Sequence, residues 1–390
     1  MAKLGEVCKV SPSTKNIERQ GAWLLNLDMV EQQTGRVIEY KYAGEDDLNG
    51  SIIQFDTENV LYSKLRPNLN KVVLPEKDGF STSELLPLRP DASVLNRDYL
   101  AVFLRSDSFV TWAVSKTAGA KMPRLGTKDL MNAEIPMPEI ERQKEIAEKF
   151  KKLEQLISLR KQQLVKLDEL VKARFVEMFG DLAALPCEYP ELKLVDVCAD
   201  ADDIKCGPFG TQLNKDEYKT KGVAVWEIPQ INSGFSEMPT HFITEEKAVI
   251  LNAYSIEPGD IAMSRKGNVG KCGLFPENFK KGIIHSDVLR IRVDKRKVDS
   301  CFMMYQLHFS EAVKRQIEMV SSGAIMAGIN VTKLKQIKVR IPELENQRMF
   351  AAFVQRVDQQ KQTVQQSLDK LELMKKALMQ EYFERSVVRR

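Results

Sequence analysis

The sequence predicts an α+β protein in which two pseudo-repeated, mixed α/β globular domains alternate with two long helices. Three observations carry this prediction: the chain repeats itself, each copy changes once from a mixed to a helical texture, and both helical segments keep an apolar seam. We expect the two helices to pair as an antiparallel, coiled-coil-like spacer between the globular domains, because each would otherwise expose its seam to water.

The repeat is visible as a set of matched segments that keep the same order in both halves of the chain. Chance does not explain such an order, so residues 1–181 and 187–386 are interpreted as two copies of one unit. Three segments of the first copy recur in the second: Met137–Gln143 as Ile341–Gln347, Gly119–Met122 as Gly323–Met326, and Leu4–Cys8 as Leu194–Cys198.

Each copy begins with a globular domain and ends with a helix. Short β-rich runs such as Val37–Tyr40 and Val223–Trp226 alternate with Gly, Pro, Asn and Asp, which predicts strands and turns over residues 1–140 and 187–344. The last quarter of each copy loses Gly and Pro. It predicts helices over residues 141–181 and 345–386.

Steps of four and three residues place apolar side chains along one face of each predicted helix. The polar exceptions in these seams are Arg160, Arg174, Lys361 and Lys375. A surface helix on its own domain is the alternative, but helices of this length span roughly 50 Å, which is too long for a small domain. The residues expected to pack in the seam are Ile146, Phe150, Leu153, Ile157, Leu164, Leu167, Val171, Phe350, Val354, Val357, Val364, Leu368, Leu371 and Leu378.

Composition excludes several classes of protein. The 58 Lys and Arg against 54 Asp and Glu leave a net charge of +4, which fits neither an acidic disordered chain nor a histone-like polycation. A basic face for nucleic acid remains compatible with this balance. The sequence holds no apolar run long enough for a membrane span and no secretory signal, so we expect a cytoplasmic protein. The 6 Cys and 3 His show no ligand spacing for a metal, and mostly buried, reduced thiols are expected.

Most signatures of catalysis are missing from the sequence. It contains no phosphate-binding loop, dinucleotide fingerprint, nucleophile elbow or zinc-protease helix, and no amino-methyltransferase signature. Glu191 and Lys193 could imitate half of a nuclease metal site, but such a triplet is common in a charged chain and is interpreted as surface. His285 is expected to be a structural histidine. No catalytic residue is therefore assigned.

Two polar loops at matching repeat positions hold side chains suited to DNA. Arg and Lys can reach guanine or phosphate, and Asn can pair with adenine. Each loop by itself is most simply interpreted as a solvated hairpin turn. Because two such loops occur at matching repeat positions, a DNA-contacting role is supported equally well. The candidate residues are Lys64, Arg66, Asn68, Asn70 and Lys71 in the first loop, and Arg265, Lys266, Asn268 and Lys271 in the second.

Gly-rich segments add further candidates. Residues 206–212 form either a tight turn with Phe209 buried or a loop that presents Thr211 and Gln212 to a base edge. The loops from Gly119 and Gly323 are expected to precede short helices. Their candidate phosphate contacts are Lys121, Arg124 and Lys333. The aromatic residues expected to belong to the core or to strands, and not to stack on bases, are Trp23, Tyr42, Tyr62 and Trp226.

The repeated Ile-Pro step into a long helix, at residues 135–143 and 341–347, resembles the conserved region of the specificity subunits of type I restriction–modification systems. Residues 207–211, with 264–271 and 285–290, resemble one class of that family's target-recognition domain. Residues 63–67 with 78–83 resemble another class. The resemblance covers essentially the whole chain, and the order domain, helix, domain, helix is its most specific feature.

This resemblance implies a non-catalytic DNA reader whose two target-recognition domains each read one half of a bipartite site, while the helices set the spacer. It implies double-stranded DNA and two modification subunits as partners, restriction subunits in a complete system, and no membrane. No cofactor is expected on this chain; S-adenosylmethionine, and ATP with Mg²⁺ for restriction, belong to the partner subunits. The alternatives are a structural adaptor that bridges proteins through its helices and, less well supported, a stand-alone nuclease.

Overall fold

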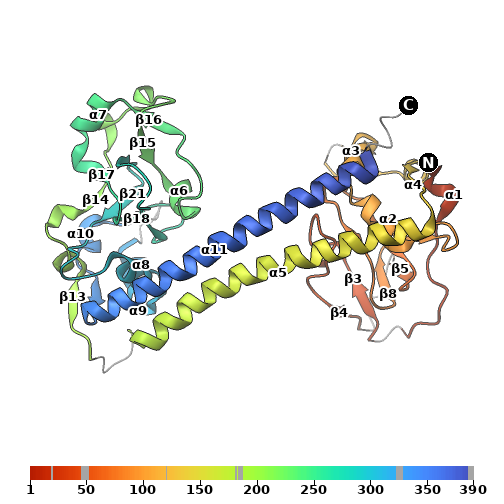
Figure 1. Cartoon of the computed structure of the whole chain (residues 1–390), viewed down its shortest axis with the longest axis horizontal. Coiled ribbons are helices and arrows are strands. Elements are labelled where there is room, and N and C mark those ends of the chain that lie inside the picture. The colour runs from red at the N-terminus through yellow and green to blue at the C-terminus, as the bar shows by residue number, and fades with distance from the viewer. Residues whose placement is uncertain are drawn as a thin grey trace. The chain divides into compact units, whose positions relative to one another are not determined.

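The computed structural model describes residues 1–18, 21–44, 52–119, 121–180, 182, 188–321 and 328–384 (Figure 1). Two compact units divide the chain. Unit 1 consists of Met1–Gln162 and Val364–Arg390, and unit 2 of Gln163–Thr363. The predicted loop from Gly323 to Met326 and the sixth cysteine, Cys187, lie outside the described residues.

In its described part, unit 1 contains two four-stranded sheets and two short strand pairs. The first sheet is antiparallel, and in the second β3 runs parallel to β8. The first sheet has the order β2 (Cys8–Val10), β9 (Leu85–Pro90), β6 (Val60–Ser63), β7 (Val72–Val73), and the second β4 (Lys41–Tyr42), β3 (Trp23–Leu25), β8 (Gly79–Thr82), β5 (Ile52–Phe55). The pairs are β1 (Ala2–Lys3) with β12 (Glu134–Ile135) and β10 (Thr117–Ala118) with β11 (Arg124–Leu125).

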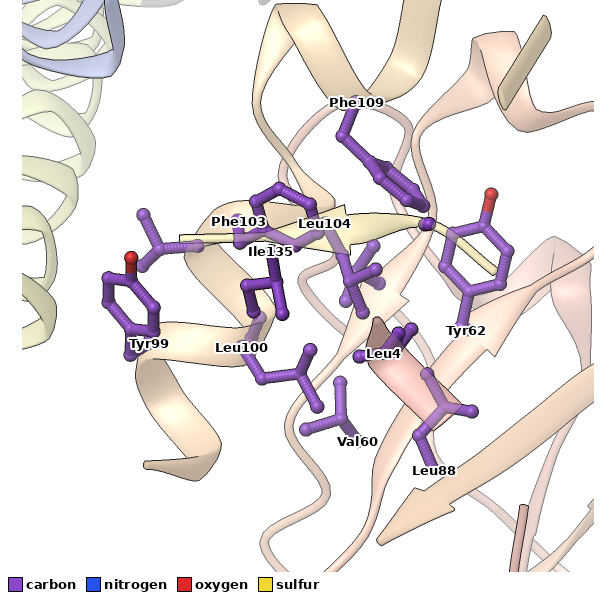
Figure 2. Close-up of a cluster of buried hydrophobic side chains, with 14 of the residues drawn as sticks. Leu4, Val60, Tyr62, Leu88, Tyr99, Leu100, Phe103, Leu104, Phe109 and Ile135 are labelled. Carbon is purple, nitrogen blue, oxygen red and sulfur yellow. The ribbon is translucent and has the colours of Figure 1, made fainter. Parts of the chain in front are cut away.

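Four short helices complete the globular part of unit 1. The Asn96 and Ser106 side chains accept hydrogen bonds from the backbone N–H groups of Tyr99 and Phe109, which caps the second and third of these helices. Figure 2 shows a hydrophobic core cluster of this unit, where Leu4, Val60, Leu88 and residues of α2 meet. The helices are α1 (Leu4–Val7), α2 (Arg97–Leu104), α3 (Asp107–Ser115) and α4 (Thr127–Met131).

In its described residues, unit 2 repeats the two four-stranded sheets of unit 1, including the parallel pairing, here between β15 and β20. Its first sheet has the order β14 (Ile204–Cys206), β21 (Val288–Ile291), β18 (Ile261–Ser264), β19 (Cys272–Leu274), and its second β16 (His241–Ile243), β15 (Val223–Trp226), β20 (Gly282–Ile284), β17 (Ser255–Ile256). Strand β13 (Glu191–Lys193) pairs with β22 (Lys338–Arg340) as β1 pairs with β12. The predicted α+β fold with two repeated globular domains is therefore confirmed.

Helices of unit 2 follow the same plan. Asp299 caps α8 through the backbone N–H groups of Cys301 and Phe302, as Asn96 caps α2. The short helices are α6 (Ile228–Asn232), α7 (Glu245–Ile250), α8 (Ser300–Phe309), α9 (Glu311–Ser321) and α10 (Val331–Leu334).

The two long helices, α5 (Ile140–Phe179) and α11 (Leu344–Met379), run antiparallel within each unit. In unit 1 the Lys375 Nζ lies 2.8 Å from a Glu154 carboxylate oxygen, and in unit 2 the Lys361 Nζ lies 2.7 Å from Asp168. These two lysines are the polar exceptions of the α11 seam, so each is paired with an acid on the other helix. Every residue predicted to pack in the seam is buried or half-buried.

Aromatic side chains at the helix ends pack on the globular parts, which the seam pattern does not predict. In unit 2, Phe175 and Phe179 of α5 lie 5.8 Å and 4.8 Å from Phe302, measured between ring centroids. In unit 1, Phe383, in the π-helical turn Gln380–Glu384 after α11, lies 5.5 Å from Tyr99. The repeat relates Phe179 to Phe383, so the two copies use equivalent residues at equivalent places.

One expectation about the β-rich residues needs correction. Residues 37–40 do not form a strand: Val37 makes an isolated bridge to Val30, and β4 begins at Lys41. Tyr40, directly before β4, stacks on Trp23, with ring centroids 5.4 Å apart. Tyr42 lies on a strand as expected but is 51% exposed. The expected core residues Trp23, Tyr62 and Trp226 are buried, and the described cysteines are free thiols.

Candidate nucleic-acid interface

The two cationic segments form equivalent hairpin loops. Residues 64–71 join β6 to β7, and residues 265–271 join β18 to β19. In the first loop, Arg66 and Asn70 adopt left-handed backbone with φ of 49° and 51° on either side of a 3-10 turn. In the second loop, Gly267 and Gly270 have φ of 68° and 81°. The second loop thus uses glycine, which adopts this region without a steric penalty, where the first uses an arginine and an asparagine.

A buried aspartate precedes the first strand of each hairpin: Asp56 lies in the turn between β5 and β6, and Asp260 lies directly before β18. The Arg89 guanidinium donates to Asp56 at 2.6 Å, and the Arg292 guanidinium donates to both oxygens of Asp260 at 2.7 Å. Both aspartate side chains are almost fully buried. The strands that carry the loops are therefore fixed by charge-assisted hydrogen bonds inside each unit.

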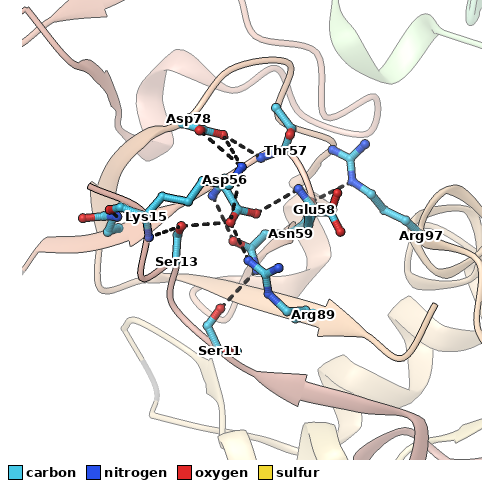
Figure 3. A network of polar contacts seen from close by, with 11 residues as sticks. Ser11, Ser13, Lys15, Asp56, Thr57, Glu58, Asn59, Asp78, Arg89 and Arg97 are labelled. Atoms are coloured by element: carbon cyan, nitrogen blue, oxygen red, sulfur yellow. Dashed lines mark hydrogen bonds and ion pairs between the residues drawn. The ribbon is translucent and has the colours of Figure 1, made fainter. Parts of the chain in front are cut away.

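Figure 3 shows the network around Asp56, which includes Ser13, Lys15 and the backbone N–H of Glu58. Burial opposes ionisation of the carboxyl group. Hydrogen bonds from Arg89, Ser13 and the Glu58 N–H outweigh this effect and lower the pKa of Asp56. Asp56 is therefore held as a carboxylate near neutral pH.

Two lysines predicted to contact DNA are used inside the units instead. The Lys71 ammonium donates to the backbone carbonyl of Leu27, and the Lys271 ammonium donates to the carbonyl of Asn232 at 2.7 Å. Burial lowers the pKa of Lys71. Leu27 follows β3, and Asn232 follows the equivalent strand β15. Each lysine therefore joins the end of its hairpin loop to the same part of its unit, and we assign both lysines a structural role.

Asn70 is also turned inward, with 7% exposure and its amide nitrogen donating to the Arg105 carbonyl at 3.1 Å. It therefore anchors the first loop to the end of α2 and is not placed to pair with adenine. The remaining loop candidates reach solvent: Lys64 is half-buried, and Arg66, Asn68 and Asn268 are exposed.

An acidic residue accompanies the cations in each unit, and the sequence interpretation did not assign it a role. The Arg124 guanidinium lies 2.9 Å from a Glu84 carboxylate oxygen, and the Lys266 ammonium lies 3.0 Å from Asp287. Glu84 and Asp287 occupy matching positions before β9 and β21. A carboxylate can accept a hydrogen bond from the cytosine amino group, so these residues join the candidate set. Their occurrence at one repeat position, directly before matching strands, was the available signal.

The Gly-rich segment of unit 2 passes so close to the sheet that only glycine fits at its start. A Cβ on Gly207 would lie 2.3 Å from the carbonyl oxygens of Ile284 and His285. Thr211 and Gln212 are exposed, in a 3-10 turn that follows this close approach. The side-chain Oε1 of Gln212 accepts a hydrogen bond from the Tyr254 hydroxyl at 3.1 Å, which fixes the direction of the Gln212 side-chain amide.

Phe209 is 46% exposed, so the buried tight turn weighed for this segment is wrong. The guanidinium carbon of Arg265 lies 4.9 Å from the centroid of the Phe209 ring. The Arg265 Nε donates to the Ile329 carbonyl at 3.1 Å. The segment therefore supports the arginine of the neighbouring hairpin.

In each unit the hairpin loop and the loop before a short helix lie side by side. The Arg66 N–H donates to the Pro123 carbonyl at 2.8 Å, and the Ile329 N–H donates to the Arg265 carbonyl at 3.0 Å. Lys121 and Lys333, on these second loops and α10, are exposed. Residues from distant parts of each copy are thus brought to one surface.

Residues set aside as non-catalytic have structural partners. The His285 Nδ1 accepts a hydrogen bond from the Asp287 N–H at 3.2 Å, and Glu191 pairs with Lys338 and Arg340. Within the described residues, no three His, Cys, Asp or Glu side chains cluster as metal ligands. A search of the same residues finds no helix both apolar and long enough for a membrane crossing.

Comparison with known families gives a match over most of the chain. The family model for the type I restriction modification DNA specificity domain matches residues 1–169 and 194–373, which lie in the first and the second copy. The MjaVIII type I restriction enzyme specificity subunit of Methanocaldococcus jannaschii is 23% identical over 335 residues, covering 80% of this chain and 75% of that protein. The putative MjaX specificity subunit of the same organism is 24% identical, covering 76% and 69%.

Solved structures show the same fold. The S subunit of a type I restriction–modification system from M. genitalium aligns with a TM-score of 0.60 and 16% identity, over 98% of this chain and 95% of that chain. A chain from a study of complex assembly and conformational transition of the type I R-M system aligns with a TM-score of 0.60 and 17% identity, over 98% and 96%.

Proposed function

Since the chain belongs to the family of type I restriction modification DNA specificity domains, we propose that its two units each read one half of a bipartite DNA site. The observation that carries this proposal is the matched surface in both units, where a hairpin loop and a second loop bring cationic, amide and carboxylate side chains together. Two such surfaces on one chain, with different side chains on the same topology, suit two different half-sites.

Recognition then divides into two contributions. Exposed cations such as Arg66, Lys121 and Lys333 contact phosphates, and each phosphate neutralised contributes a slope of about −0.9 in the logarithm of affinity against that of salt concentration. A few Arg, Asn, Gln and Thr side chains discriminate between bases by roughly 1–3 kcal/mol each. Because several loop cations are engaged with Glu84, Asp287 or backbone carbonyls, we expect the isolated chain to bind DNA weakly.

The chemistry belongs to partner subunits in this proposal. Two modification subunits use S-adenosylmethionine to methylate adenine, and restriction subunits use ATP and Mg²⁺. The long helices support such docking because they expose apolar side chains away from their shared seam, including Leu159 at 59% and Leu373 at 69% exposure. In this proposal, the length of the two helices sets the number of unspecified base pairs between the half-sites.

Genome-wide mapping of N6-methyladenine tests the function directly. Cells carrying the chain with its modification subunits should show one bipartite methylated motif that vanishes when the chain is deleted. Replacing residues 1–139 with those of another family member should change one half-site and leave the other intact. Methylation that is unaffected by deletion would contradict the proposal and favour the adaptor alternative.

A further inference from the structure

Arg265 is presented by unit 2 in a fixed orientation. Its Nε donates to the Ile329 carbonyl at 3.1 Å, its guanidinium faces the Phe209 ring at 4.9 Å, and its backbone N–H donates to the Asp287 carbonyl at 2.8 Å. Its Nη1 and Nη2 make no hydrogen bond to any residue that the structure describes. The two terminal nitrogens are therefore available to a ligand, while the ring and the carbonyl restrict where the guanidinium can lie.

The carboxylate of Asp287, whose backbone carbonyl binds Arg265, forms an ion pair with Lys266. The Asp287 carboxylate lies 3.0 Å from the Lys266 ammonium, and both side chains are partly exposed. Arg265 forms no ion pair within the described residues. The charge of Arg265 is therefore available to a ligand, whereas the charge of Lys266 is paired with that of Asp287.

We propose that Arg265 reads a guanine in the half-site bound by unit 2, with Nη1 and Nη2 donating to guanine O6 and N7. Phe209 acts as a positioning residue that holds the guanidinium plane. A phosphate contact would need only positive charge, whereas one hydrogen bond from each of two terminal nitrogens to a single base edge needs an oriented planar fork. The inference rests on the proposed function, because it assigns a base to the surface proposed for DNA.

The segment that carries Phe209 is built for this support. Gly207 lets the chain pass against β20, and Gly210, with φ of 55°, turns it back after the phenylalanine. The repeat places Lys64 of unit 1 at the position of Arg265. Lysine lacks a planar fork, so the half-site read by unit 1 serves as an internal control in the same complex.

The first experiment maps methylation by the full complex with Arg265→Ala, Arg265→Lys and Phe209→Leu. Both arginine variants should turn one G·C position of the unit 2 half-site degenerate, and the unit 1 half-site should stay unchanged. Arg265→Lys keeps the charge, so a loss of discrimination in this variant separates base reading from phosphate binding. Phe209→Leu should weaken discrimination at the same position. Lys333→Ala should weaken binding without changing the motif.

The second experiment measures binding of the complex to duplexes carrying its mapped motif. Replacing the assigned guanine by 7-deazaguanine removes N7 but keeps base pairing. The unaltered complex should lose about 5- to 150-fold in affinity, since each 1.4 kcal/mol is tenfold and removing the acceptor of one charged hydrogen bond costs about 1–3 kcal/mol. The Arg265→Lys complex should lose less than about twofold on the same replacement.

Three outcomes would overturn this inference while leaving the proposed function intact: a unit 2 half-site without any G·C pair, arginine variants that weaken all sequences equally with an unchanged motif, or equal 7-deazaguanine penalties for the unaltered and variant complexes. Methylation that persists without the chain would instead remove the proposed function itself. If Arg265→Ala fails to fold, Arg265→Lys and the modified duplexes still decide the question.

Discussion

A buried glutamine near the start of each long helix ties that helix to the globular part of its unit. The Gln143 carbonyl oxygen accepts from the Asn96 N–H at 2.9 Å, and its amide donates to the Val94 and Pro138 carbonyls at 2.9 Å and 2.8 Å. The equivalent Gln347 is fully buried as well and accepts from the Asp299 N–H at 2.9 Å. One side chain thus joins the start of each long helix to the cap of a helix in the globular part.

Replacing Gln143 with leucine should destabilise unit 1. Three backbone groups that now bond to the buried Gln143 side chain would lose their partner, and an unsatisfied buried group costs about 1–3 kcal/mol. We expect a loss of about 3 kcal/mol or more in the free energy of unfolding, measured by calorimetry of the full chain. Gln162→Leu, on the exposed face of α5, is the control and should change stability by less than about 0.5 kcal/mol. Equal melting temperatures for both variants would contradict this role.

Asp56 should make the stability of unit 1 depend on pH. Its pKa is lower in the folded state than in the unfolded chain. The stabilisation is therefore fully present above about pH 4, the ordinary Asp pKa, and is lost as pH falls through the lower folded-state pKa.

Asp56→Asn should cost about 2 kcal/mol at pH 7, because it removes charge-assisted hydrogen bonds from Arg89. Unfolding measured at pH 7 and at pH 3 should show the gap between the original chain and the variant narrowing in acid. Lys15→Gln, with 49% of its side chain exposed, should cost less than about 1 kcal/mol. A gap that is constant with pH would rule out the carboxylate as its source.

The candidate site could be predicted from the sequence only in part. Repeat position and residue type correctly locate two matched hairpin loops. Whether a loop lysine faces solvent depends on carbonyls that lie far away in the chain, as Leu27 does for Lys71 and Asn232 does for Lys271. The Phe209–Arg265 stack likewise joins residues more than fifty positions apart, so local pattern carries no signal for it.

Among the elements, the long helices are the best predicted and the sheets the least. A seam of steps three and four recurs over α5 and α11, so its period is readable locally. The strands are two to six residues long, and their partners are set by tertiary contacts. The parallel pairing found among the described strands of each unit, β3 with β8 and β15 with β20, has no local signature.

The helix ends stabilise the globular parts in a way that can be tested one unit at a time. Phe383→Ala removes a fully buried ring beside Tyr99 and Phe103 and should cost about 3–5 kcal/mol in unit 1. Phe179→Ala should have the same effect in unit 2. Hydrogen exchange should show lost protection in α2 for the first variant and in α8 for the second. Equal losses in both helices for either variant would contradict the assignment.

For the whole molecule, the proposed function makes helix length a determinant of DNA spacing. Seven residues inserted after Gln162 and seven before Val364 keep the phase of the seam and lengthen both helices by about 10 Å. At about 3.4 Å per base pair, the methylated motif should gain about three unspecified positions with both half-sites unchanged. Insertion into one helix alone should disrupt the pairing and abolish methylation. A motif of unchanged length would show that the helices do not set the spacer.

Unit 1 starts with the first residue of the chain but needs the last helical turns, since Met379 and Phe383 belong to its core. Unit 2, in contrast, is one uninterrupted stretch of chain. During synthesis on the ribosome, unit 2 therefore has all its residues before unit 1 does. Apolar side chains of the first part of unit 1 therefore stay exposed until the residues after unit 2 have been synthesised, and a premature stop within α11 would leave them uncovered.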